Sequence, residues 1–176
     1  QERGRMVLWY VTFSCQSPLP SLMIEYPAMD MRIWPWMTWK YKLDGQLLWS
    51  VTDWNKNAYA YLDDQPCNGE GRFLYPGVDG KPVDSIRWEN LRDGLEDYDI
   101  FCLLEAAADE LQEKQPELAK KLRDALEIKP EIVNAIWDFT HSYDTLTAAR
   151  GTYDQLIAGG AGSLQQALAA LAAVDI

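Results

Sequence analysis

Two strand-like segments separated by a helix-like segment limit the folds open to this chain. Residues 6–14 are rich in Val, Trp, Tyr, Thr and Phe, and residues 46–52 form a second apolar run of strand length. The aromatic-rich segment 29–42 between them has the pattern of a helix that Pro35 interrupts early, in its first turn, and that Asp44-Gly45 ends. This order of elements is typical of a parallel α/β barrel.

The rest of the chain predicts one more strand and then helices alone. A long loop at 55–70 precedes a short strand at 72–75, consecutive turns at 76–82, and a long helix that begins at Asp84 or Ser85. Four further helices are expected, at 116–127, 130–143, 145–158 and 163–174.

Three parallel strands alone would leave open sheet edges, so we expect them to be part of a larger sheet. The predicted fold class is α/β. Residues 1–114 are expected to be the closing β/α units, the C-terminal portion, of a (β/α)8 TIM-type barrel. Residues 115–176 are expected to form a C-terminal helical extension packed on it, and the missing N-terminal part of the same barrel is the expected partner.

Charge and cysteine content argue against several classes of function. Twenty-seven acidic residues against sixteen basic ones give a net charge of −11, which would repel nucleic acid and anionic membranes over most of the surface. No apolar run approaches the roughly 20 residues of a membrane span. Three widely spaced cysteines and one histidine lead us to expect no metal site and no cofactor, and a disulfide between Cys15 and Cys67 stays open.

Aromatic and acidic residues follow the predicted strands, where α/β barrels build their active sites. Trp49 and Trp54 flank Asp53; indole rings stack on the apolar faces of sugars, and a carboxylate accepts hydrogen bonds from their hydroxyls. Tyr10 lies on the more polar face of the first strand, where a phenol can bond a sugar. These four residues are the predicted substrate-binding residues. The alternative is that they pack in the core, and strand alternation does not decide whether Trp49 or Ser50 points inward.

Other conspicuous residues are interpreted as structural. His141 is expected to pack within a tail helix. The acidic residues between Glu89 and Asp99 are expected to pair with Arg87 and Arg92 at helical spacing. Three tryptophans are expected to pack the first helix on the barrel: Trp34, Trp36 and Trp39.

Several motifs of this chain resemble a known family. In chain order they are Trp39-Lys40-Tyr41, Leu43-Asp44-Gly45, Leu48-Trp49-Ser50, Phe73-Leu74-Tyr75-Pro76-Gly77, Ser85-Ile86-Arg87 and Leu91-Arg92-Asp93-Gly94-Leu95-Glu96-Asp97-Tyr98. With these motifs the chain resembles the module called domain of unknown function 4091, which occurs in the catalytic region of glycoside hydrolase family 123. The resemblance covers about the first 105 residues closely.

That resemblance implies a retaining glycoside hydrolase that removes terminal β-linked N-acetylgalactosamine, or a related 2-acetamido sugar, by substrate-assisted catalysis. In this mechanism the sugar's acetamido oxygen attacks the anomeric carbon, one carboxylate stabilises the oxazoline, and a neighbouring glutamic acid protonates the leaving oxygen. The partner implied is therefore a glycan, and a secreted or periplasmic location is expected for an enzyme acting on external glycans.

The family carries its two acids in an Asp-Glu pair at a strand end. The only such dipeptide here, Asp109-Glu110, lies in a helical pattern on its solvated side, so we do not assign the catalytic roles to it. We expect the pair upstream of Gln1, with no catalytic residue in this chain, and we expect the chain alone to be inactive. The alternative function is a non-catalytic carbohydrate-binding or scaffold module that keeps the aromatic site without the acids.

Overall fold

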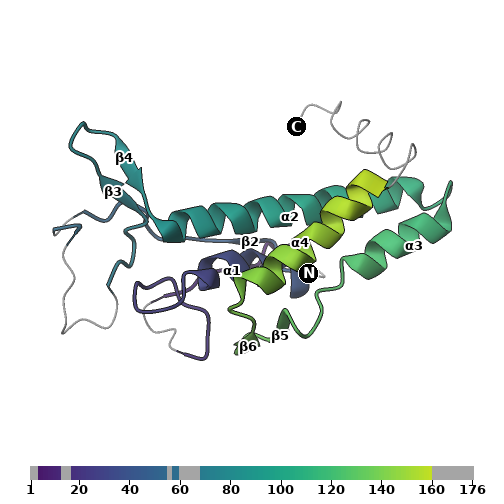
Figure 1. The fold of residues 1–176 in the computed structure, drawn as a ribbon, viewed down its shortest axis with the longest axis horizontal. Coiled ribbons are helices and arrows are strands. Elements are labelled where there is room, and N and C mark those ends of the chain that lie inside the picture. The colour runs from purple at the N-terminus through teal and green to yellow at the C-terminus, as the bar shows by residue number, and fades with distance from the viewer. Residues whose placement is uncertain (1–3, 13–16, 55–56, 60–67, 160–176) are drawn as a thin grey trace.

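A helix between two parallel strands forms the N-terminal part of the fold (Figure 1). The computed structural model describes residues 4–12, 17–54, 57–59 and 68–159. Strand β1 (Leu8–Trp9) pairs in parallel with β2 (Gly45–Gln46), with Leu8 opposite Gly45 and Trp9 opposite Gln46, and helix α1 (Met29–Lys40) connects them. The predicted strand–helix–strand unit is thus confirmed, with shorter strands, while the barrel around it stays a prediction.

Helix α1 continues through Pro35, which corrects the expectation that this proline interrupts the helix in its first turn. A proline inside a helix costs about 3 kcal/mol, so tertiary packing has to offset it. Residues 30–39 are all buried, and helix α2 (Ile86–Leu111) crosses closely at Gly94. A Cβ on Gly94 would lie 2.6 Å from the carbonyl oxygen of Arg32 and 3.0 Å from Cγ of Pro35. The close crossing of the two helices therefore holds α1 intact.

The end of α1 also differs from the expectation. Lys42 adopts a φ of 52°, its amide bonds Trp39 O, and the amide of Leu43 bonds Thr38 O, both at 3.0 Å. This closing turn satisfies carbonyls of the last helical turn. The helix therefore ends before Asp44-Gly45, and Gly45 belongs to β2.

The predicted third strand forms a hairpin of its own. Strand β3 (Leu74–Pro76) pairs antiparallel with β4 (Pro82–Asp84), a strand that the sequence does not predict between the expected turns at 76–82 and the long helix. The predicted long helix follows as α2 (Ile86–Leu111), and the hydroxyl of its N-cap Ser85 accepts a hydrogen bond from the amide of Trp88 at 3.2 Å. The antiparallel pairing shows that β3 does not extend the parallel pair within the described chain.

The C-terminal half contains two predicted helices and one wrong prediction. Helices α3 (Pro116–Ala125) and α4 (Tyr143–Gly159) lie close to their expected positions. Residues 130–143, expected to be helical, instead carry a hairpin of β5 (Val133–Ala135) and β6 (Asp138–Phe139). Val133 is wholly buried while Asn134 is exposed, the alternation of a half-buried strand. The expected helix 163–174 and the cysteines Cys15 and Cys67 lie outside the described residues.

One hydrophobic core joins the long helices to the C-terminal elements. Its buried side chains come from α1, α2, α3, β5 and α4, and include Trp36, Phe101, Leu122, Val133 and Leu146. A second, smaller cluster lies nearer the strands and contains Val11, Trp34 and Phe73. Whether the chain divides at residue 114 into barrel units and a tail stays a prediction.

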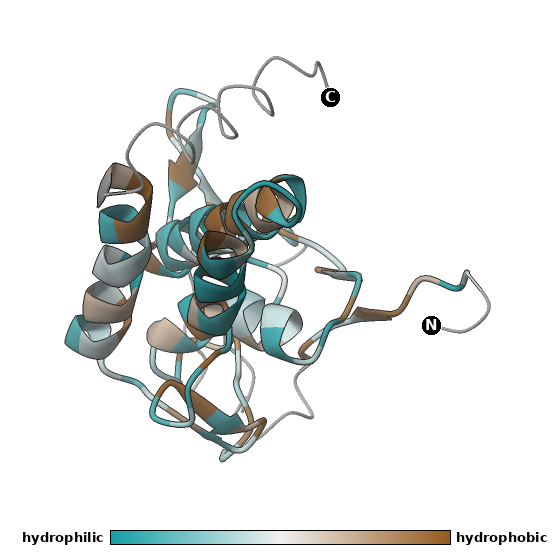
Figure 2. Cartoon of the chain, turned by 90° about the vertical axis from the view of Figure 1, so that its right-hand side faces the viewer, coloured by the Kyte–Doolittle hydropathy of each residue, from teal (hydrophilic) through white to brown (hydrophobic). Residues whose placement is uncertain are grey.

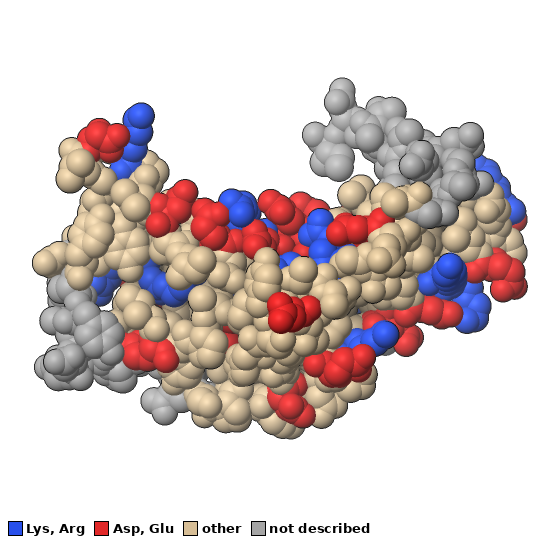
Figure 3. Space-filling model, viewed as in Figure 1, with Lys and Arg blue, Asp and Glu red and all other residues tan. Residues whose placement is uncertain are grey.

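The acidic residues of α2 divide into an exposed and a buried group. Arg92 contacts Glu89, Asp93 and Glu96 on the surface, as expected, and acidic and basic atoms lie side by side along α2 in Figure 3. Asp97 is wholly buried instead. Its carboxylate accepts hydrogen bonds from Arg32, Trp36 and Arg150.

Candidate functional site

The parallel strand pair has one packed face and one exposed face. Trp9 and Val11 pack towards the helices, whereas Tyr10 is 56% exposed, as the predicted alternation requires. Leu47 and Trp49 are also exposed, Trp49 by 55%. The hydrophobic segment around β1 extends away from the helices in Figure 2. Both predicted aromatic ligands on the strands are therefore accessible in this chain.

The Trp49 ring packs against Gly71, a residue that is not among the predicted site residues. Gly71 has a φ of +67°, and a Cβ built on it would lie 2.6 Å from Cζ2 of the Trp49 indole. The carbonyl of Gly71 also accepts a hydrogen bond from the amide of Asp53 at 2.8 Å. Gly71 thus contacts two of the predicted site residues, the ring of Trp49 and the backbone of Asp53. The sequence signal that could have found it is the pair of glycines in Gly69-Glu70-Gly71.

Trp54 is held against the β3–β4 hairpin. Its Nε1 donates a hydrogen bond to Leu74 O at 2.9 Å, and its side chain is 41% exposed. Tyr59 takes a similar position, because its hydroxyl donates to Pro76 O at 2.9 Å and its ring centroid lies 5.2 Å from that of Tyr75. Tyr59 was not identified from the sequence, where it lies in the long loop without a distinguishing pattern.

Arg87 fastens the glycine segment to α2. It donates to the carbonyl oxygens of Leu22, Gly69 and Arg72 at 2.5, 3.0 and 2.6 Å, and burial lowers the pKa of its guanidinium. The expectation that Arg87 pairs with the acidic cluster of α2 is therefore wrong. Its side chain turns inward, because the buried carbonyls of this segment need a donor. Arg87 acts as a positioning residue for Gly69 and, through it, for Gly71.

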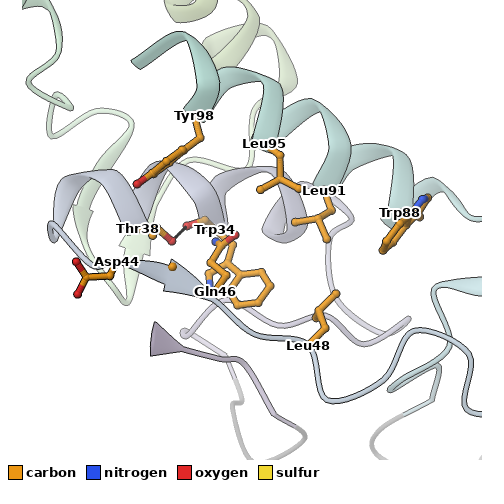
Figure 4. A pocket seen from close by; sticks show the side chains of 10 residues that line it. Trp34, Thr38, Asp44, Gln46, Leu48, Trp88, Leu91, Leu95 and Tyr98 are labelled. Atoms are coloured by element: carbon orange, nitrogen blue, oxygen red, sulfur yellow. Dashed lines mark hydrogen bonds between the residues drawn. The ribbon is translucent and has the colours of Figure 1, made fainter. Parts of the chain in front are cut away.

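A hollow of about 330 Å³ lies between α1, β2 and α2, on the helix side of the strands. It is lined mostly by apolar groups, and Figure 4 shows Trp34, Leu48, Leu91 and Tyr98 around it. None of the four predicted site residues lines it, and Asp44 is its only acidic residue. The hollow therefore offers an apolar surface without a pair of carboxylates.

The dipeptide Asp109-Glu110 lies on the exposed end of α2. Asp109 Oδ1 is 2.7 Å from a guanidinium nitrogen of Arg123, and Glu110 Oε1 is 3.9 Å from Nζ of Lys114. Both carboxylates are thus engaged in solvated ion pairs.

The described part of the chain brings no three His, Cys, Asp or Glu side chains together in a group that could hold a metal ion. No helix in that part is long and apolar enough to cross a membrane.

One comparison with known proteins is informative. The family model described as glycoside hydrolase 123, catalytic domain, matches residues 1–104, more than half of the chain. The matched region contains all four predicted site residues together with Gly71 and Arg87. No curated protein matches the chain.

Proposed function

The chain belongs to glycoside hydrolase family 123, and from that premise we propose that it is the C-terminal part of a retaining glycosidase acting on terminal β-linked N-acetylgalactosamine or a related 2-acetamido sugar. The family match over residues 1–104, which includes the exposed aromatic residues at the strand ends, is the observation that carries this proposal. The strand pair then belongs to the closing units of a (β/α)8 barrel, whose active site lies at the carboxyl ends of the strands.

The site residues of this chain bind and orient the sugar in this proposal. The Trp49 indole, fixed on Gly71, stacks on the apolar face of the ring, and Asp53 accepts hydrogen bonds from its hydroxyls. Tyr10 and Trp54, both exposed, supply further aromatic surface for the sugar in this proposal. Orienting the acetamido group is the task of this pocket, because substrate-assisted catalysis needs the acetamido oxygen aligned with the anomeric carbon.

The two catalytic acids come from outside this chain in this proposal. The engagement of Asp109 with Arg123 and of Glu110 with Lys114 supports that assignment. The chain alone then binds sugar without cleaving it. In the complete barrel, one acid of the upstream pair stabilises the oxazoline and the other protonates the leaving oxygen.

Hydrolysis of a chromogenic β-N-acetylgalactosaminide, measured side by side for this chain and for the full-length parent protein, tests the proposal. We expect activity in the parent alone, and at least a tenfold loss of kcat/KM in its Trp49→Ala variant. The matched control is Tyr41→Ala, which removes an exposed aromatic side chain at the end of α1. Activity of this chain alone would contradict the location of the acids, and an unaffected Trp49→Ala variant would contradict the pocket.

A non-catalytic carbohydrate-binding or scaffold module is the second candidate. Two observations favour it: Trp49 and Trp54 are exposed, and the Asp109-Glu110 dipeptide is engaged with Arg123 and Lys114. Saturable binding of N-acetylgalactosamine by the parent protein without turnover would establish this function instead.

A further inference from the structure

A hollow of about 220 Å³ lies between the segment that leads into α1 and the β5–β6 hairpin. One wall comes from residues 17–30, inside the region that the family model matches, and the other from residues 137–141, outside it. None of the four residues proposed for the sugar pocket lines this hollow. It is therefore a separate feature, built by different elements.

A buried carboxylate and an exposed imidazole meet in this hollow. Asp30 is 1% exposed, and its Oδ2 accepts a hydrogen bond from the amide of Ser21 at 2.9 Å. Its Oδ1 lies 3.0 Å from Nδ1 of His141, whose side chain is 51% exposed, and accepts no hydrogen bond from other described residues. A carboxylate facing Nδ1 orients the ring, so Nε2 becomes the nitrogen available to a ligand. The expectation that His141 packs within a tail helix is therefore wrong, because His141 lies outside the helices and Asp30 holds it at the surface.

The remaining walls are aromatic and acidic. Trp137, in the turn between β5 and β6, is 61% exposed, and Phe139 lies beside His141 with ring centroids 4.7 Å apart. Asp138 lies between these two aromatic residues, and its Oδ2 accepts a hydrogen bond from Asn134 at 2.7 Å. The hydroxyl of Tyr26 accepts a bond from the amide of Ser17 at 3.3 Å and carries a proton that it can donate.

Size and charge narrow the class of ligand. Sites for drug-sized molecules measure roughly 300–1,000 Å³, so this hollow suits one small ring. Two carboxylates within a chain of net charge −11 disfavour an anion. An accessible indole face beside carboxylate, imidazole and phenol groups suits a molecule with one apolar face and a rim of hydroxyls.

We infer that this hollow is a second saccharide-binding site, which takes a single neutral pyranose unit. Trp137 stacks on the sugar ring, while Asp138 and the Asp30-oriented His141 bond its hydroxyls. Burial raises the pKa of Asp30, which is consistent with a carboxylate kept from water and dependent on its two partners. The site goes beyond the proposed glycosidase function, because it needs neither the catalytic acids nor the Trp49 pocket.

NMR titration of the ¹⁵N-labelled chain tests the site directly. The probes are galactose, glucose and N-acetylgalactosamine, with choline as a cationic probe, because aromatic side chains with carboxylates can also bind ammonium groups. The indole N–H signals of Trp137 and Trp49 are assigned from Trp137→Phe and Trp49→Phe, and they report on the two sites separately. We expect at least one sugar to shift the Trp137 signal saturably, and choline to leave it unchanged.

Variants then identify the groups that bind. We expect Trp137→Ala and His141→Ala each to weaken binding at this site at least tenfold, while Trp49→Ala and the control Tyr41→Ala leave it unchanged. Because Trp137 is mostly exposed, its truncation should leave the circular dichroism spectrum intact; binding by Trp137→Ala is followed through the Phe139 amide signal.

Three results would overturn the inference: no sugar shifts the Trp137 signal, choline shifts it in place of a sugar, or Trp137→Ala and His141→Ala bind as the wild type does. A sugar-induced shift of the Trp49 signal alone would overturn this site and leave the proposed function intact. A shift of the Trp137 signal alone would establish this site and contradict sugar binding by the Trp49 pocket of this chain.

Discussion

Asp97→Asn is the substitution that most directly tests how this fold is held together. Asp97 is wholly buried, and it accepts hydrogen bonds from Arg32 Nε at 3.0 Å, Trp36 Nε1 at 2.9 Å and Arg150 at 2.6 Å. These partners come from α1 and α4, so one carboxylate joins three helices. Asparagine keeps the shape of the side chain and removes its charge.

The expected cost follows from the charges left behind. The side chain of Arg32 is 6% exposed and that of Arg150 is 25% exposed. Arg150 also pairs with a second carboxylate, that of Asp154. Removing one partner of a buried ion pair costs about 3–5 kcal/mol, because the other charge stays buried without compensation. For a chain of this size, that loss lowers Tm by about 6–20 °C.

Urea and thermal unfolding, followed by circular dichroism, measure this loss. Asp93→Asn on the same helix is the matched control, because Asp93 bonds the exposed Arg92 and its loss should leave stability unchanged within error. Arg150→Met should lower the free energy of unfolding less in the Asp97→Asn background than in the wild type. In that background the substitution removes a charge that has already lost its partner Asp97. The reasoning is refuted if the free energy of unfolding of Asp97→Asn lies within about 1 kcal/mol of that of the wild type.

Three further substitutions test separate features. Gly71→Ala should lower the free energy of unfolding by at least about 1–2 kcal/mol, because it places a Cβ at a φ of +67° and against Trp49. It should also weaken sugar binding at the Trp49 pocket. Unchanged sugar binding in a titration would contradict the role of Gly71. Burial raises the pKa of Tyr153 to about 12, so the folded chain keeps this proton between pH 10 and 12 while the unfolded chain loses it. Stability should then fall by up to about 2.7 kcal/mol as pH rises through that window, and unfolding of Tyr153→Phe should lack this component while matching the wild type at pH 7. Ser85→Ala should cost about 1 kcal/mol in urea unfolding by removing the cap of α2, whereas Ser85→Asp should restore most of it.

Elements with strong local signals were located well from the sequence. The serine cap of α2 and the proline at the start of α3 act within a few residues, and these two helices lie near their expected positions. The alternation along β1 likewise identified Tyr10 as lying opposite the packed face, because side-chain direction in a strand follows from the backbone alone.

Elements whose form depends on distant contacts were wrong or missed. Pro35 stays within a helix because α2 crosses at Gly94. Residues 133–139 form a hairpin that buries Val133 in the core shared with α2 and α4, although their apolar spacing also suited a helix. Short apolar runs fit either structure, and tertiary packing selects between them.

The sequence by itself determined the element types near strong signals, the acidic composition, the family resemblance and the face of the first strand that carries Tyr10. Only the tertiary structure decided how these residues are held: Trp49 on Gly71, Arg87 on the carbonyls before β3, Asp97 between Arg32 and Arg150, and His141 on Asp30. Each of these contacts joins residues at least 15 positions apart, and most join residues more than 50 apart. A local pattern carries no signal for such pairs, because their energy depends on burial and charge that exist only after the helices have packed.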